Sequence, residues 1–262
     1  MKTQTIIALL TDFGIEDGYV ASMKAVIISR VPNCQIIDIS HSVEPQNIDQ
    51  AAYLLWSSFR YFPKNTTFIC VVDPGVGTDR KIICLESEGY RFLAPDNGVL
   101  KYVLGSLKKQ KIVSVQNSKY FLSKLSTTFQ GRDIFAPVAA HLTNGLAIKN
   151  LGPSTTPLFH AERFVEVLSI AHEQYQGKII NIDRFGNIVT NYFLSTYPKG
   201  KMLLSVGRKT ISEFSKTYAD GTGKKPFMII GSSELLEISV RNGNAAKLLK
   251  TKINQKVNLK IE

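Results

Sequence analysis

The sequence predicts a two-domain protein, in which an α/β domain with a mainly parallel sheet covered by helices precedes a smaller antiparallel β domain. Apolar strand-like runs alternate with helical patterns over the first part of the chain, which is typical of a parallel sheet. Residues 152–159, GPSTTPLF, contain two prolines and no periodicity, so they indicate a linker. Short strand patterns separated by glycine turns dominate the rest. The expected boundaries are 1–150 for the α/β domain, 151–165 for the linker and 166–262 for the β domain.

The first domain contains the clearest strand and helix signals. The run from Phe68 to Val72 is continuously apolar, as in a strand that is buried on both faces. Apolar residues recur at helical spacing before Pro32, which ends that helix, and Asn47 is expected to cap the next one. The predicted strands are 6–10, 36–39, 68–72, 82–85 and 112–115, and the predicted helices are 17–31, one that starts at Asn47, and 134–142.

The second domain shows many short strands and a single short helix. The predicted strands are 177–182, 188–192, 201–206, 227–230, 236–240 and 256–261, and the helix is 245–249. Frequent short strands with glycine turns predict a small antiparallel barrel or a sandwich.

Composition and charge argue against two classes of binding partner, nucleic acids and membranes. The chain has 262 residues, of which 44% are hydrophobic, and a formal net charge of +11. The basic residues are scattered without a nucleic-acid-binding signature, so they predict a solvated face and no nucleic-acid partner. No apolar run reaches the roughly 18 residues of a membrane span, so no membrane partner is expected. Three cysteines without CxxC spacing indicate reduced thiols, and we therefore expect a cytoplasmic protein.

Polar residues gather where the strands of the first domain are expected to end. Asp12 follows the first strand, Asp38 lies at the end of the second, and Asp73, within the segment VVDPGVGTDR, follows the third. The segments APDNG and FQGRD add Asp96 and Gln130. Ligands of open α/β sheets bind in the crevice beyond the carboxyl ends of the strands. A binding site at this edge of the sheet is the prediction.

Several kinds of chemistry are poorly supported. DPGVG fits neither of the glycine-rich phosphate-binding motifs, and no GxSxG or Cys/His signature of a hydrolytic nucleophile occurs. The four histidines have no ligand spacing, so no metal site is predicted. The carboxylates suit a ligand rich in hydroxyl and cationic groups, and Asp12 could accept two hydrogen bonds from a ribose diol.

Seven motifs in order resemble the S-adenosylmethionine hydroxide adenosyltransferases, a family related to the adenosyl-type fluorinases and chlorinases. They are LLTDFG..DGYV..MK, IIDISHSV.P..I..AAYLL, YFP..T.F..VVDPGVG..R, APDNG.L, F.GRDIFAPVAA.L, ID.FGN.VTN and GSS..LEI...NGNAA. The resemblance covers nearly the whole chain. It implies a larger α/β domain, a C-terminal β-barrel, and a homotrimer with active sites between subunits.

The resemblance also implies a reaction, in which water or hydroxide attacks the ribose C5′ of S-adenosylmethionine to give adenosine and methionine without a further cofactor. Asp73 and Arg80 match two members of the family's catalytic Asp–Arg–His triad. Pro74, Gly75 and Gly77 are expected to shape the tight loop that carries them.

The resemblance assigns the remaining candidates to substrate binding. Asp12 matches the ribose-diol aspartate. In the second domain Asp183 matches a residue at the methionine amino group, Phe185 one that packs on adenine, Asn187 one that hydrogen-bonds the base, and Ser232 a contact at the methionine end. Glu234 and Leu235 depart from the Gly-Tyr of the family, which weakens the assignment at that end.

The largest departure is Gln130. The family motif reads F-H-G-R-D and its histidine is the third triad member, whereas this chain has FQGRD. An amide can hold a water molecule but cannot accept a proton at neutral pH. Three interpretations therefore stay open: a hydrolase, a halide-using adenosyl transferase of the chlorinase kind, and a non-catalytic binder of adenosine or S-adenosylmethionine.

Overall fold

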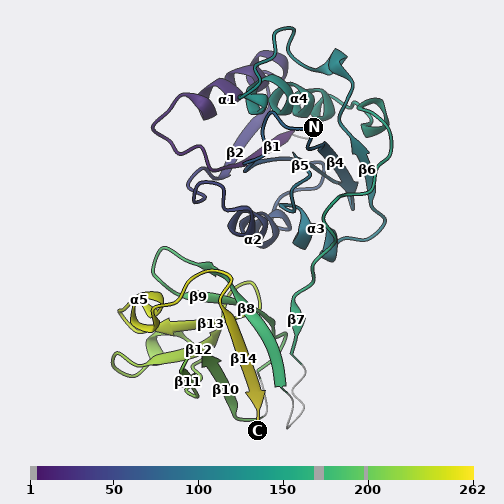
Figure 1. Cartoon of the computed structure of the whole chain (residues 1–262). Helices are drawn as coiled ribbons and strands as arrows, with labels where there is room; N and C mark the ends of the chain where they lie inside the picture. The colour runs from purple at the N-terminus through teal and green to yellow at the C-terminus, as the bar shows by residue number, and fades with distance from the viewer. Residues whose placement is uncertain (1–4, 168–173, 198–199) are drawn as a thin grey trace. The chain divides into compact units, whose positions relative to one another are not determined.

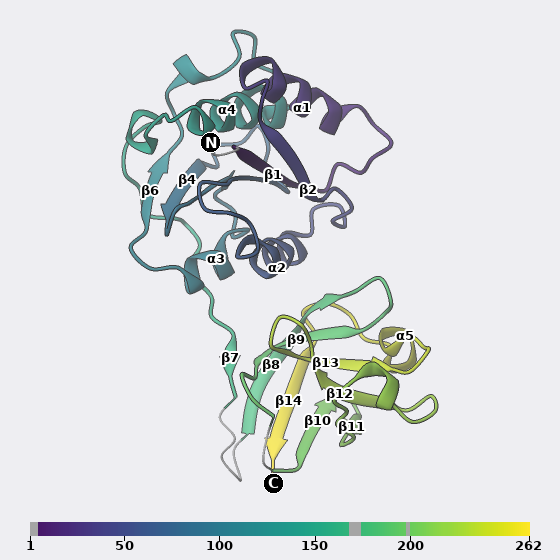
Figure 2. The ribbon, with the colours of Figure 1, turned by 180° about the vertical axis from the view of Figure 1, so that it is seen from behind.

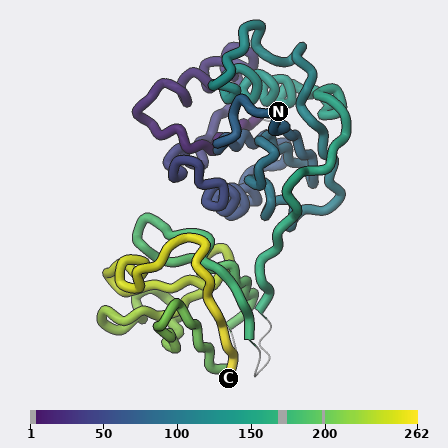
Figure 3. Tube along the Cα trace, viewed as in Figure 1, coloured from purple at the N-terminus to yellow at the C-terminus, as the bar shows by residue number. Residues whose placement is uncertain are grey.

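The chain forms two compact units, Met1–Arg163 and Phe164–Glu262, and each is described by itself (Figures 1 and 3). The computed structural model describes residues 5–167, 174–197 and 200–262. In the described part of the chain, no helix combines the length and the apolar character needed to span a membrane.

The first unit is built on a six-stranded sheet with the order β2-β1-β3-β5-β4-β6. Neighbouring strands are parallel from β2 to β5, and β4 is antiparallel to both β5 and β6. The mainly parallel sheet is therefore confirmed. The strands are β1 (Ile6–Thr11), β2 (Gln35–Ser40), β3 (Thr67–Val71), β4 (Ile82–Ser87), β5 (Tyr90–Pro95) and β6 (Lys111–Ser114). The helices are α1 (Tyr19–Arg30), α2 (Ile48–Phe59), α3 (Lys101–Ser106) and α4 (Ala136–Thr143), with short turns η1 (Ser118–Tyr120), η2 (Gly131–Phe135) and η3 (Ile148–Asn150).

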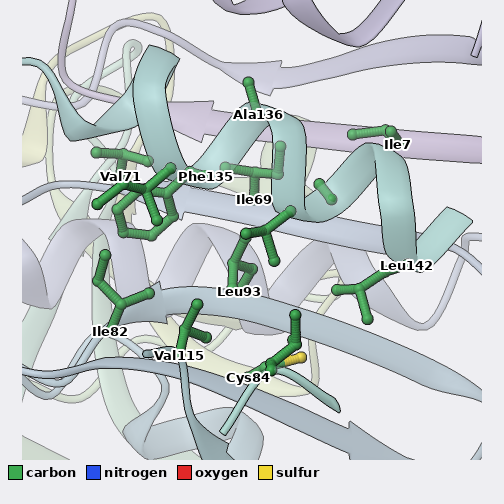
Figure 4. Packing of buried hydrophobic residues seen from close by; sticks show 14 of the residues in the cluster. Ile7, Ile69, Val71, Ile82, Cys84, Leu93, Val115, Phe135, Ala136 and Leu142 are labelled. Atoms are coloured by element: carbon green, nitrogen blue, oxygen red, sulfur yellow. The ribbon is translucent and has the colours of Figure 1, made fainter. Parts of the chain in front are cut away.

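Helices cover both faces of this sheet. Alternate residues of β1 point to opposite faces, so Ile7 and Leu9 belong to one apolar cluster and Ala8 and Leu10 to another. The first cluster includes residues of α1 and α4, and the second includes residues of α2 and α3. Figure 2 shows these two pairs of helices on opposite sides of the sheet. Figure 4 shows the first cluster, with the strand residue Ile69 beneath the helical segment. All five residues of β3 are buried, as its continuous apolar run predicts.

The sequence analysis did not predict two elements of the first unit, β5 and α3. Strand β5 follows β4 after a two-residue turn, in which Glu88 and Gly89 both have positive φ angles of 49° and 80°. Two left-handed residues are typical of the tight turn that matches hairpin twist. Because β5 lies between β3 and β4, this hairpin is what makes β4 antiparallel. The other element that the sequence does not predict is the short helix α3.

Other helices agree with the sequence. The Asn47 side chain accepts a hydrogen bond of 3.0 Å from the Gln50 N–H, so it caps α2 as expected. The helix predicted at 134–142 begins earlier, with the π-helical turn η2, and continues as α4.

The second unit is an antiparallel sheet with the order β11-β10-β14-β8-β9-β13-β12, and β7 pairs with β9 in parallel. After β11, Ser215 N donates to Met228 O at 2.9 Å and Met228 N donates to Glu213 O at 2.8 Å, so this end of the sheet joins β12. These bonds nearly close a barrel around an apolar interior, so the antiparallel barrel is confirmed and the sandwich is not. Its strands are β7 (Val165–Glu166), β8 (Gln174–Ile182), β9 (Ile188–Phe193), β10 (Met202–Val206), β11 (Lys209–Ile211), β12 (Pro226–Ile230), β13 (Leu235–Val240) and β14 (Lys256–Ile261), with η4 (Tyr218–Asp220) and the predicted helix α5 (Ala245–Leu249).

The stretch expected to be a linker hydrogen-bonds to the first unit. Ser114 N donates to Pro153 O at 2.9 Å, and Glu162 N donates to Lys101 O at 3.0 Å. The backbone from residue 153 to residue 162 therefore belongs to the α/β unit.

Candidate active site

A pocket of about 390 Å³ opens where β1 and β3 end. These strands are parallel neighbours, so the loops that follow them leave the same edge of the sheet. The pocket brings together Asp12, Asp73 and Gln130, which lie far apart in the sequence. It is lined by Asp12, Phe13, Tyr19, Gln46, Val71, Asp73, Pro74, Val76, Thr128, Phe129, Gln130 and Gly131.

Arg80 joins Asp73 to Gln130. Its Nε donates to both carboxylate oxygens of Asp73, at 3.0 Å to Oδ1 and 2.8 Å to Oδ2. Its Nη2 donates to Asp73 Oδ2 and also to Gln130 Oε1. The side chains of Asp73 and Arg80 are only 4% and 12% exposed, so this ion pair is much less screened than a surface pair. Arg80 is therefore in direct contact with both of the other positions that the resemblance assigns to catalysis.

The loop from Asp73 to Arg80 turns back on itself to form this contact. Val76 N donates to Asp73 O at 3.2 Å, and the Thr78 hydroxyl donates to Gly75 O at 2.7 Å. Gly77 has φ +82°, and a Cβ at that residue would stand 2.9 Å from the carbonyl oxygen of Thr127. A side chain at Gly77 would therefore be strained and would also push against the backbone that precedes Gln130.

The π-helical turn η2 presents Gln130 at its start. The Ala136 N–H bonds to Gly131 O, so the first turn is wider than an α-helical turn. Such turns are frequent at functional sites. The next carboxylate, Asp133, is fully buried and pairs with Arg132, whose Nε lies 2.6 Å from Oδ1. Burial opposes ionisation, but Arg132 and the Ser126 N–H outweigh it and hold the pKa of Asp133 below its ordinary value.

Asp12 also lines the pocket, and one of its carboxylate oxygens accepts a hydrogen bond from the protein. Its Oδ2 accepts a hydrogen bond of 2.8 Å from the Gln46 N–H. Three aromatic rings line the same pocket, since Phe13, Tyr19 and Phe129 have centroids 5.0–6.0 Å apart. The sequence reasoning missed this aromatic group, although Phe13 and Phe129 directly adjoin the predicted residues Asp12 and Gln130.

Other strand-end residues serve the scaffold. The buried His41 lies between Thr11, with a Nδ1–Oγ1 distance of 2.8 Å, and Asp38, with a Nε2–Oδ1 distance of 3.1 Å. Burial would raise the pKa of Asp38, but its contacts with Lys24 and His41 lower it. Asp96 accepts the Leu158 N–H at 3.0 Å on both oxygens. None of these residues lines the pocket.

The second unit holds the remaining candidates in two loops. Asp183 Oδ1 accepts from the backbone N–H of Phe185 and of Asn187, at 2.9 and 2.8 Å, and its Oδ2 accepts from the Asn187 amide at 2.8 Å. Asp183 therefore folds its own loop, while the Phe185 side chain is 76% exposed. Ser232 is exposed in the turn before β13. Glu234 in that turn has φ +60°, a conformation that suits glycine better than glutamate.

A buried carboxylate underlies that second turn. Glu237 in β13 is 8% exposed, and its Oε2 accepts from the Tyr218 hydroxyl at 2.9 Å. Burial raises the pKa of Glu237, and the charge of Asp183 raises it further, although Tyr218 opposes the shift. Among the described residues, no group of three or more His, Cys, Asp or Glu side chains could hold a metal ion.

Comparison with known proteins identifies the family. The profile of the SAM hydroxide adenosyltransferase N-terminal domain matches residues 7–152, and that of the C-terminal domain matches residues 177–258. The chain belongs to the SAM hydroxide adenosyltransferase family. The resemblance drawn from the motifs is thereby confirmed.

Individual members of this family and its relatives differ in their similarity to the chain. An (R)-S-adenosyl-L-methionine hydrolase from Thermus thermophilus is 34% identical over 257 residues, which cover 95% of this chain and 97% of the hydrolase. A fluorinase from Actinoplanes is 28% identical over 212 residues, or 71% of each chain. The crystal structure of an uncharacterized conserved protein from Thermotoga maritima superposes with a TM-score of 0.86 at 34% identity, covering 97% of this chain and 99% of that one. The hydrolase therefore matches a larger share of the chain than the fluorinase does.

Proposed function

We propose that the protein hydrolyses S-adenosyl-L-methionine to adenosine and L-methionine by attack of water on the ribose C5′. The observation that carries the proposal is that Arg80 hydrogen-bonds to both Asp73 and Gln130, two residues that line one pocket, in a chain that aligns over nearly its whole length with an S-adenosylmethionine hydrolase.

The site suits the chemistry of a sulfonium substrate. The sulfur leaves as a neutral thioether, so no acid is needed to protonate it. The protein has to hold a water molecule in line with the C5′–S bond and to exclude other water. The Asp73–Arg80 pair supplies a fixed, nearly buried polar group for that water, and the aromatic rings around Tyr19 restrict solvent. Asp12 Oδ1 has the acceptor capacity to bind a ribose hydroxyl.

We extend the proposal to the other substrate contacts and to assembly. In it, Asp183 and Ser232 contact the methionine part, and Phe185 and Asn187 contact adenine. These residues come from a neighbouring copy in a homotrimer. The exposed Phe185 ring supports this arrangement, because an accessible aromatic face can stack on a base.

Product analysis tests the reaction. The purified protein is incubated with S-adenosylmethionine, with and without chloride, and the products are identified by mass spectrometry. We expect adenosine and methionine in both cases. A chlorinated deoxyadenosine would favour the halide-using alternative, and unchanged substrate that binds tightly would favour a binder.

Light scattering with an activity assay tests the assembly. We expect a trimer that adenosine stabilises, since a ligand that binds only the assembled state shifts the equilibrium by mass action. A fully active monomer would contradict the shared site.

A further inference from the structure

The contact between Arg80 and Gln130 determines which way the Gln130 amide faces. A guanidinium has five N–H donors and no acceptor, so the group that Arg80 contacts must be the amide oxygen. The structure has this arrangement, with Arg80 Nη2 donating to Gln130 Oε1. The amide nitrogen therefore points away from Arg80.

The amide nitrogen is available to a ligand in the pocket. Within the described part of the chain, no protein group hydrogen-bonds to Gln130 Nε2, and the side chain does not cap η2. Gln130 lines the pocket together with Asp73. Two N–H donors thus adjoin the pocket at the position where the family histidine presents a ring.

Asp73 keeps acceptor capacity beside these donors. Its Oδ2 accepts two bonds from Arg80, whereas its Oδ1 accepts one, from Nε. A carboxylate oxygen can accept two hydrogen bonds, so Oδ1 has one lone pair left. A water molecule between Gln130 and Asp73 would accept an N–H bond on one lone pair and donate a proton to Oδ1, which leaves its second lone pair for attack.

We propose that Gln130 positions the attacking water by donating from Nε2, and that Asp73, not residue 130, accepts the proton of that water. This inference rests on the proposed hydrolysis. The water oxygen forms a bond to C5′, the C5′–S bond breaks, and its electron pair stays on sulfur as the neutral thioether of methionine. The proton of the water moves to Asp73 Oδ1 and then to solvent.

Adenosine formation by four variants tests both halves of the inference: Gln130→Met, Gln130→His, Asp73→Asn and the Asp73→Asn/Gln130→His double variant. Gln130→Met keeps the length of the side chain without a donor, so kcat should fall about tenfold, the effect of one hydrogen bond, with little change in KM. Asp73→Asn should lower kcat about 10²-fold or more in the parent. In the Gln130→His background, the factor by which Asp73→Asn lowers kcat should be at least about tenfold smaller, because the introduced imidazole can take the proton.

The pH dependence of kcat distinguishes a role of residue 130 in the reaction from a purely structural role, which would leave this dependence unchanged. We expect no inflection of kcat near pH 6.5 in the parent, and one near the ordinary imidazole pKa of about 6.5 in Gln130→His. Melting temperatures and calorimetric binding of S-adenosylmethionine show whether each variant is folded.

The possible outcomes separate the two proposals. A Gln130→Met variant with the parent's kcat, or an equal cost of Asp73→Asn in both backgrounds, overturns the inference and leaves the hydrolase standing. If Asp73→Asn does not fold, a Gln130→Met variant with the parent's kcat still overturns the inference. A parent that forms no adenosine overturns the hydrolase proposal itself, and this inference with it.

Discussion

Arg80 Nε lies within hydrogen-bonding distance of both carboxylate oxygens of Asp73, at 3.0 and 2.8 Å, in a pair whose side chains are almost buried. One guanidinium thereby fixes the carboxylate and, through Nη2, the amide of a residue from a distant helix turn. Removal of Arg80 would leave Asp73 charged and without its partner in a poorly solvated place, which costs far more than the loss of a surface ion pair.

Arg80→Ala should therefore lower kcat by at least about 10²-fold, because neither Asp73 nor Gln130 keeps its orientation. Arg80→Lys is the matched control, since it keeps the charge but cannot donate as a planar fork, and we expect an intermediate kcat. Steady-state adenosine formation measures both. If Arg80→Ala were as active as the parent, the group of Asp73, Arg80 and Gln130 would not be needed for catalysis.

Asp12→Asn should weaken adenosine binding about tenfold or more, because the amide loses the charge and one of the acceptors that a ribose diol needs. Asparagine keeps an oxygen for the Gln46 N–H, so the loop bond of 2.8 Å can persist and the effect reports on the ligand. Isothermal titration calorimetry gives the dissociation constant. An unchanged constant in the folded variant would contradict the ribose assignment.

Gly77→Ala should destabilise the protein by about 1–2 kcal/mol through its left-handed backbone, and by more where the new Cβ meets Thr127 O. It should also lower kcat, since this loop carries Asp73 and Arg80. Gly145→Ala is the matched control: Gly145 has φ +93° but no atom within 4 Å of an added Cβ, and it does not line the pocket. Chemical denaturation and activity assays should show a smaller stability loss and the parent's kcat for Gly145→Ala. If Gly77→Ala lost less stability than Gly145→Ala and kept the parent's kcat, the loop from Asp73 to Arg80 would be shown to tolerate movement.

These glycine effects illustrate what the sequence could predict. The motif around Gly77 indicated a tight loop, and the alternation of patterns indicated a parallel sheet with helices on both faces. Residues 245–249 and the Asn47 cap were predictable because local chemistry decides them. Strand β5 was not, because it depends on a two-residue hairpin whose first left-handed residue is Glu88, an unusual residue for that conformation.

The site was less predictable than the fold. Motif order brought Asp73, Arg80 and Gln130 into one hypothesis, but sequence carries no information on which atoms meet. That Arg80 faces the oxygen of Gln130 follows only from three-dimensional contact. The two hydrogen bonds that Asp183 accepts from Asn187, one on each carboxylate oxygen, likewise depend on the geometry of that loop. The strand pattern alone could not distinguish a barrel from a sandwich, because closure depends on hydrogen bonds around residues 213–215 outside any predicted strand.

Glu237→Gln should stabilise the protein at pH 7, by about 2 °C in melting temperature. Burial raises the pKa of Glu237 in the folded state, so the folded state binds its proton more tightly than the unfolded state does. The contribution of this residue to stability is therefore present below the unfolded pKa and is lost as the pH rises through the folded pKa. A neutral amide avoids that loss and keeps an acceptor for the Tyr218 hydroxyl.

Melting curves of Glu237→Gln and the parent from about pH 4 to about pH 8 check this sign. The difference in melting temperature should grow with pH across that range. A difference that is constant or shrinks would show that Glu237 is ionised at no cost in the folded protein.

Gln130→His should accelerate hydrolysis of S-adenosylmethionine by up to about 10²-fold, with little change in affinity, because an imidazole can accept the proton of the attacking water and an amide cannot. The neighbouring framework favours a correctly placed ring, since Gly131 is buried, with the Met23 sulfur 3.2 Å from where a Cβ would stand, and Asp133 is held by Arg132. The gain should vanish below about pH 6.5, where the imidazole is protonated. It should also vanish in an Arg80→Ala background, which serves as the control. A folded Gln130→His variant no faster than the parent at about pH 8 would show that a side chain at position 130 does not reach the attacking water.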